Sequence, residues 1–110
     1  MTPYIYRVLE VIKVHDGDTV ELRIDLGFRM TIVRQCRLYG INAAELKDDV
    51  VQAEAARHRL AELLMDGPIL CKTYRDATEK YGRLLVGLIN NSEVCINEAM
   101  VREGYAKQYV

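Results

Sequence analysis

Two carboxylates that lie two residues apart are the first side chains in this sequence with the spacing for chemistry. They belong to residues 16–19, which read Asp16-Gly17-Asp18-Thr19. The Asp-Gly dipeptide is typical of hairpin turns, so the segment by itself is explained by a turn between two strands. Two carboxylates on a tight turn are also suited to a hard cation such as Ca²⁺, which prefers oxygen ligands. Both interpretations stay open at this point.

A second set of polar side chains lies in residues 37–45. Arg37 carries a planar fork of donors that suits a phosphate group. Asn42 offers an amide oxygen to a metal ion, and Glu45 is a carboxylate that could take a proton from water. We expect the three side chains to converge at one end of a barrel. A loop with solvated charges is the alternative.

A third set lies in residues 79–83, where Gly82 permits a tight backbone turn. Arg83 is expected to project at the start of the next strand, with Tyr81 beside it as a stacking surface. A solvated polar hairpin loop is again the alternative.

Strand-like runs must position these three segments. Residues 4–14 and 29–38 are strand-like, and residues 19–26 alternate cleanly between apolar and polar, as expected of a half-buried strand. The apolar positions expected to share one face in each run are Val8, Ile12 and Val14 in the first; Val20, Leu22, Ile24 and Leu26 in the second; and Met30, Ile32, Cys36 and Leu38 in the third.

A helix is expected next. Asp49 is placed to cap it, with Gln52 at the third helical position as in a capping box. Gly67-Pro68 is expected to end it. The apolar positions at helical spacing are Ala53, Ala56, Leu60, Leu63 and Leu64.

The remaining residues complete a pattern typical of a small barrel. Residues 69–75 and 83–89 predict two strands, and Asn97 is expected to cap a short helix that ends at Gly104. This order predicts a mainly β protein with helices: a five-stranded OB-fold barrel with a helix between strands three and four and a short C-terminal helix. A small α+β sandwich and an SH3-like barrel are alternatives. The 110 residues fit one domain, residues 1–110.

Composition excludes several classes of protein. Fifteen basic and sixteen acidic residues give a net charge of -1, so overall charge does not indicate nucleic-acid binding. Charges interrupt every apolar run before the ~20 residues that span a bilayer, so no membrane segment is expected. The three cysteines are too few and too widely spaced for a disulfide framework or a zinc site. No secretory signal opens the chain, so the cytoplasm is the expected location.

The combination of segments resembles the staphylococcal nuclease (thermonuclease) family. Four segments carry the resemblance, and it spans roughly residues 8–107. None of the four is specific by itself, but their combination and order are. The segments are residues 11–20, 37–45, 80–83 and 97–106.

The resemblance implies a Ca²⁺-dependent phosphodiesterase, an endonuclease or exonuclease that cleaves DNA and RNA with little sequence preference and leaves 3′-phosphate products. Single-stranded or frayed substrate is expected to be preferred, and no obligate protein partner is inferred. The implied roles are residue-specific. Asp18 is a direct metal ligand, Asn42 stands at a second ligand position, Ala43 gives its backbone carbonyl, Asp16 supports the metal's water shell, Glu45 is the general base, Arg37 and Arg83 hold the scissile phosphate, and Tyr81 and Tyr109 line the nucleotide site.

The sequence departs from the family pattern at the metal site. Asn42 stands where the family usually has a carboxylate, which removes one negative charge. Ala43-Ala44 stands where the family usually has a proline before the glutamate, which leaves that loop less restricted. A non-catalytic OB-fold module that binds nucleic acid or a partner is the main alternative, and an enzyme adapted to another metal such as Mn²⁺ is a third possibility.

Overall fold

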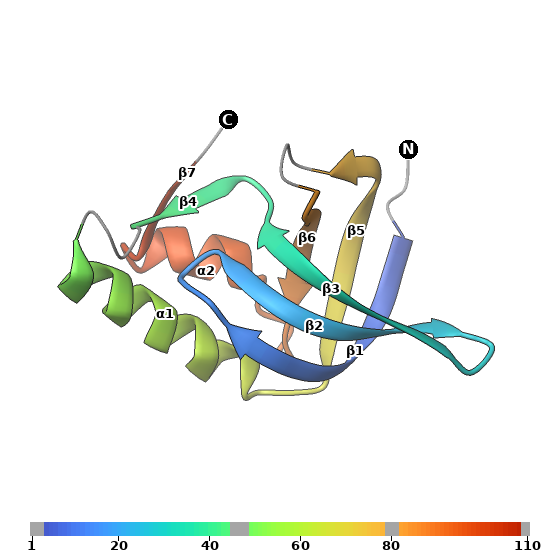
Figure 1. Cartoon of the computed structure of the whole chain (residues 1–110). Helices are drawn as coiled ribbons and strands as arrows, with labels where there is room; N and C mark the ends of the chain where they lie inside the picture. The colour runs from blue at the N-terminus through green and yellow to red at the C-terminus, as the bar shows by residue number, and fades with distance from the viewer. Residues whose placement is uncertain (1–3, 45–48, 79–81, 109–110) are drawn as a thin grey trace.

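The strands of the protein close into a barrel (Figure 1), seen in a computed structural model that describes residues 4–44, 49–78 and 82–108. The order around the barrel is β1-β2-β3-β6-β5, and the pairing of β5 with β1 closes the ring. Only β3 and β6 of this closed ring run parallel. This arrangement is consistent with the predicted OB-fold. The barrel strands are β1 (Tyr4–Val14), β2 (Thr19–Gly27), β3 (Met30–Leu38), β5 (Ile69–Thr78) and β6 (Leu84–Ile89).

Two helices and a small second sheet complete the described chain. Helix α1 (Val50–Leu64) lies between the third and fourth barrel strands in sequence, as predicted, and α2 (Ile96–Arg102) follows β6. Strand β4 (Ile41–Ala43) pairs antiparallel with β7 (Ala106–Gln108). The sequence did not predict this pair, because three-residue strands are too short to show an alternation. No helix that the structure describes is long and apolar enough to cross a bilayer.

The core confirms the clearest periodic patterns. Val20, Leu22 and Ile24 of β2 are buried inside the barrel. All five residues of the predicted apolar stripe on α1 are buried, and the Gln52 amide donates to Asp49 Oδ1 at 3.1 Å, which confirms the N-cap. The cysteines are free, and Cys36 and Cys71 are buried as expected.

The predicted face of the first strand is partly wrong. Val8 is buried, but Ile12 is 39% exposed, and Val11 packs against the core instead. Register irregularities lie between Val8 and Glu10 and between Val11 and Lys13. Because a bulge inserts an extra residue, it changes which side chains face inward further along the strand. A strict period of two therefore fails here.

The ends of β2 and β3 differ from the prediction for another reason. Leu26 and Met30 were expected in the apolar faces, but they are 37% and 60% exposed. Their hairpin extends beyond the body of the barrel, on the side away from both helices (Figure 1). Alternation fixes which face a residue is on, but not whether another element covers that face.

The predicted cap of the second helix is wrong. Cys95 is the N-cap, and it makes no side-chain capping bond. Asn97 lies within the first turn and is buried. Its Oδ1 accepts from the Leu88 amide at 3.1 Å, and its Nδ2 donates to the carbonyls of Tyr39 at 2.9 Å and Val86 at 3.0 Å. Asn97 therefore ties α2 to β6 and to the end of β3 rather than capping its own helix.

Candidate functional site

The turn between β1 and β2 is fitted closely against other elements. The Asp18 amide donates to Asp16 Oδ1 at 3.0 Å, which holds the two acidic residues in one compact turn. A Cβ added to Gly17 would lie 2.7 Å from Ala56 Cβ on α1 and 2.8 Å from Ala43 Cβ on β4. Glycine is therefore required at this position because the turn packs directly on helix and strand.

The Asp18 side chain connects this turn to the segment that follows β3. Asp18 is 4% exposed. Its Oδ2 accepts from the Ala43 amide at 2.8 Å, and its carbonyl accepts from the Leu38 amide at 2.8 Å. These hydrogen bonds bring residues 16–19 together with the described part of residues 37–45.

The Arg37 guanidinium lies between the two segments. Its Nη1 is 3.1 Å from Asp18 Oδ2, and its Nη2 donates at 3.1 Å to both the Ile41 carbonyl and Asn42 Oδ1. The planar fork of arginine allows these contacts to be made from different sides at once. The guanidinium is therefore held in a fixed place beside Asp18 and Asn42.

Thr19 brings in the third segment. Its hydroxyl donates to Asp18 Oδ1 at 3.0 Å and accepts from Arg83 Nη1 at 3.2 Å. Thr19 is buried, and it pairs with Arg37 across β2 and β3. No role for Thr19 was expected from the sequence. Its position directly after the second aspartate of the turn, at the start of an alternating strand, was the available signal.

The surroundings of Asp16 change the protonation of its carboxyl group. Burial, together with the neighbouring Asp18, raises the pKa of Asp16 from its ordinary value of 3.8 to about 6. A bound cation would favour the ionised form of such a carboxyl. Calcium binds carboxylate, amide and backbone carbonyl oxygens, and Asp16, Asp18, Asn42 and Ala43 offer all three kinds. The donor set therefore fits Ca²⁺ in its chemistry.

The negative charge of this donor set is small. In the described part of the chain, no group of three or more His, Cys, Asp or Glu residues is arranged to hold a metal ion. Asp18 Oδ2 and Asn42 Oδ1 also both contact Arg37. A cation that used these oxygens would have to share them with the guanidinium.

Three of the predicted site residues lie outside the described residues. They are Glu45, Tyr81 and Tyr109. Of the remaining predicted residues, the structure brings Asp16, Asp18, Arg37, Asn42, Ala43 and Arg83 together around the β1–β2 turn.

A comparison with protein-family models gives the family of the chain. A model described as staphylococcal nuclease homologue matches residues 35–110, which is more than half of the chain. The chain belongs to the staphylococcal nuclease homologue family. The matched region contains Arg37, Asn42 and Arg83 but begins after the turn that holds Asp16 and Asp18. Contacts in the structure join that turn to the family region. A comparison with curated proteins gave no match.

Membership in this family points to a nuclease-type or nucleic-acid-related function. The closed barrel agrees with this, since OB-folds commonly bind oligonucleotides on one side of the barrel.

Proposed function

We propose that this protein is a Ca²⁺-dependent phosphodiesterase that hydrolyses DNA and RNA with little sequence preference and leaves 3′-phosphate products. The observation that carries the proposal is the network around Asp18, which contacts Arg37 directly and Arg83 through the Thr19 hydroxyl. The guanidinium groups of Arg37 and Arg83 and the carboxylates of Asp16 and Asp18 belong to three separate segments of the sequence. In the structure they lie together.

The two arginines are proposed to bind the phosphate that is cleaved. Negative charge grows on the phosphate oxygens as water attacks phosphorus. Guanidinium donors that are already in position stabilise that charge, and removing one positioned donor typically costs ~3 kcal/mol of the barrier reduction. Arg37 is already oriented by the Ile41 carbonyl, and a bound phosphate would replace some of its contacts with Asp18 and Asn42.

The acidic residues are proposed to hold the metal. Asp16, Asp18, Asn42 and the Ala43 carbonyl would hold Ca²⁺, which when bound supplies Lewis acidity toward a phosphate oxygen. The Asp18 carboxylate already accepts from Thr19 and from the Ala43 amide, and these bonds orient it without using all of its lone pairs.

Glu45 is proposed as the general base. It follows Ala43 by two residues in the sequence, and the Ala43 amide donates a hydrogen bond to the Asp18 carboxylate. The carboxylate would take a proton from the attacking water while the water oxygen forms a bond with phosphorus. The bond from phosphorus to the 5′ oxygen breaks, that oxygen takes up a proton from solvent, and the 3′-phosphate remains on the other fragment.

The test is cleavage of denatured DNA with Ca²⁺ or with a chelator. We expect cleavage only with Ca²⁺, and a loss of about 10²–10⁴-fold in Glu45→Gln, which keeps the size of the side chain but removes the base. Glu62→Gln changes an exposed glutamate of α1 and is the matched control, with unchanged activity. Cleavage in chelator, or cleavage unaffected by Glu45→Gln, would overturn the proposal.

A non-catalytic nucleic-acid-binding module is the second candidate. Asn42 supplies an amide rather than a carboxylate, and both Asn42 and Asp18 contact Arg37. These contacts oppose metal binding and favour the module. Binding of DNA in chelator, with no cleavage under Ca²⁺ or Mn²⁺, would support it. Cleavage under Mn²⁺ alone would instead support a nuclease adapted to that metal.

A further inference from the structure

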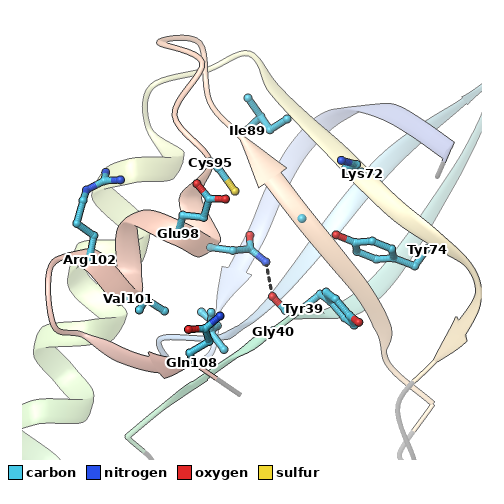
Figure 2. A pocket seen from close by; sticks show the side chains of 13 residues that line it. Tyr39, Gly40, Lys72, Tyr74, Ile89, Cys95, Glu98, Val101, Arg102 and Gln108 are labelled. Carbon is cyan, nitrogen blue, oxygen red and sulfur yellow. Dashed lines mark hydrogen bonds between the residues drawn. The ribbon is translucent and has the colours of Figure 1, made fainter. Parts of the chain in front are cut away.

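A cavity of about 630 Å³ opens beside helix α2, on the outer side of the barrel at β5 and β6 (Figure 2). Of the described residues assigned to the site, which are Asp16, Asp18, Arg37, Asn42, Ala43 and Arg83, none lines it. Its volume lies within the range of about 300–1,000 Å³ that is typical of small-molecule pockets. Its lining includes Tyr39, Ile41, Lys72, Tyr74, Glu98 and Arg102.

Two tyrosines form one wall of this cavity. The ring centroids of Tyr39 and Tyr74 are 4.4 Å apart, with planes inclined by 37°. Tyr39 is 48% exposed although it is in contact with another ring. Burial, with Tyr39 and Cys95 nearby, raises the pKa of Tyr74, so its hydroxyl stays neutral and able to donate a hydrogen bond. The pair presents aromatic surface and polar groups together.

The walls around the tyrosines are fixed by backbone contacts. The Tyr39 amide donates to the Val86 carbonyl at 2.8 Å, and the Tyr39 carbonyl accepts from Asn97 Nδ2 at 2.9 Å. Gly87 lies in the floor, where a Cβ would be 3.8 Å from both Tyr74 Oη and Lys72 Cβ. A residue with a longer side chain at Gly87 would fill space that is now open. The cavity is therefore held open by the fold itself.

The cavity is adjacent to the proposed phosphate site. Ile41 lines the cavity, and its carbonyl accepts from Arg37 at 3.1 Å. Tyr39 follows Arg37 by two residues at the end of β3. A polynucleotide whose phosphate lies on Arg37 would thus have a neighbouring nucleotide within reach of this wall.

The charges around the cavity suit an anionic chain. Lys72 and Arg102 are basic and Glu98 is acidic, so the described lining residues carry two positive charges against one negative charge. In Figure 2, Glu98 and Arg102 come from α2, across from the tyrosines, and the Arg102 side chain points away from them. Exposed aromatic rings together with cations are the combination that binds single-stranded nucleic acid by stacking on bases.

We propose that this cavity binds the base of a nucleotide adjacent to the cleaved phosphodiester, stacked on Tyr39 and Tyr74, with Lys72 near the backbone phosphates. The inference rests on the proposed function, because it needs the polynucleotide to lie at Arg37. It adds a binding site for one base, outside the phosphate and metal positions.

The test measures binding of hexathymidylate in chelator, so that no cleavage occurs. We expect the double variant Tyr39→Leu, Tyr74→Leu to bind about tenfold more weakly than the unmodified chain, since stacking of one base on an aromatic ring is of that order. The matched control is Tyr4→Leu, since Tyr4 is an exposed tyrosine of β1 that also stacks on another ring, that of Tyr6, and does not line the cavity. It should bind as the unmodified chain does.

A change in the ligand keeps the test independent of the folding of the variant. The ligands are a series of hexathymidylates, each of which lacks the base at a different position. The unmodified chain should bind one member of the series about tenfold more weakly than the others. The double variant should bind all members equally. Equal binding of all these ligands would overturn the base site alone. Failure of the unmodified chain to bind any of them would overturn the proposed function as well. A concentration-dependent dimer that the double variant abolishes would also overturn the base site, because a second copy would then cover the tyrosines.

Discussion

Arg37 Nη1 lies 3.1 Å from Asp18 Oδ2, so the residue expected to bind phosphate and the residue expected to bind the metal are paired with each other. Both side chains are mostly buried, and such a pair depends on further hydrogen bonds to offset desolvation. Asp18 receives these from Thr19 and Ala43, and Arg37 gives them to Ile41 and Asn42. A bound metal ion and a bound substrate would each replace some of these contacts.

Replacing Arg37 by lysine tests whether the shape of the guanidinium matters. We expect Arg37→Lys to lower kcat by about 10²-fold, because an ammonium group keeps the charge but cannot reach a phosphate and its present acceptors as a planar fork does. The measurement is cleavage of denatured DNA under Ca²⁺. Arg23→Lys is the matched control, since Arg23 is exposed and pairs with Glu10 on the neighbouring strand, and its activity should not change. An Arg37→Lys enzyme within twofold of the unmodified one would contradict the role.

Restoring a carboxylate at Asn42 tests the metal site. We expect Asn42→Asp to strengthen Ca²⁺ binding by about tenfold, because affinity for calcium rises with the number of charged ligands. Titration calorimetry with Ca²⁺ alone measures this directly. Asn91→Asp adds the same charge in an exposed turn after β6 and should not change the affinity. No gain at Asn42 would count against this residue as a ligand.

The raised pKa of Asp16 predicts how stability depends on pH when no metal is bound. In the folded protein the carboxyl keeps its proton up to a pH of about 6, whereas in the unfolded chain it loses the proton near its ordinary value of 3.8. Ionisation of Asp16 therefore destabilises the fold as the pH rises between these values, and the loss is complete above about pH 6. Asp16→Asn should remove this loss.

Urea unfolding in chelator at several pH values measures the effect. From pH 4 to pH 6, the free energy of unfolding of Asp16→Asn should rise relative to that of the unmodified protein. With Ca²⁺ added at pH 7, the unmodified protein should gain more stability than the variant, since a ligand that binds only the folded state stabilises it. A difference that does not change with pH would contradict the assigned pKa.

Gly17 should tolerate no larger residue. We expect Gly17→Ala to lower the free energy of unfolding by about 1–3 kcal/mol, because its Cβ would lie 2.7 Å from Ala56 Cβ and 2.8 Å from Ala43 Cβ. The turn would have to move away from β4, so cleavage by the folded fraction should also fall. Gly67→Ala is the control, because the nearest atom to its Cβ is 3.9 Å away. Equal stability of Gly17→Ala and the unmodified protein would show that the turn is not packed as described.

Asn97 should be important for stability although it caps no helix. We expect Asn97→Ala to lower the free energy of unfolding by about 2–4 kcal/mol, since it leaves the Leu88 amide and the Tyr39 carbonyl without this partner inside the protein. Asn91→Ala, in an exposed turn, should change it by less than about 0.5 kcal/mol. Chemical unfolding measures both. A small effect at Asn97 would mean that water replaces its hydrogen bonds.

The sequence alone determined the features that depend on local periodicity. Alternation in β2 correctly predicted that Val20, Leu22 and Ile24 are buried, and helical spacing correctly predicted the buried stripe of α1. The Asp49 cap also follows from local chemistry, since its carboxylate reaches an amide three residues away. The order of these elements was enough to predict the barrel.

Only the tertiary structure decided what depends on contacts between distant segments. The bulges of β1 come from its pairing with β2, and the pairing of Asn42 with Lys107 joins two strands too short to show a period. Asn97 looked like a helix cap because its type is suited to one, but burial against β6 gave it other partners. The pairing of Asp18 with Arg37 is of the same kind: the sequence supplies both charges, but the distance between them exists only once the barrel has closed.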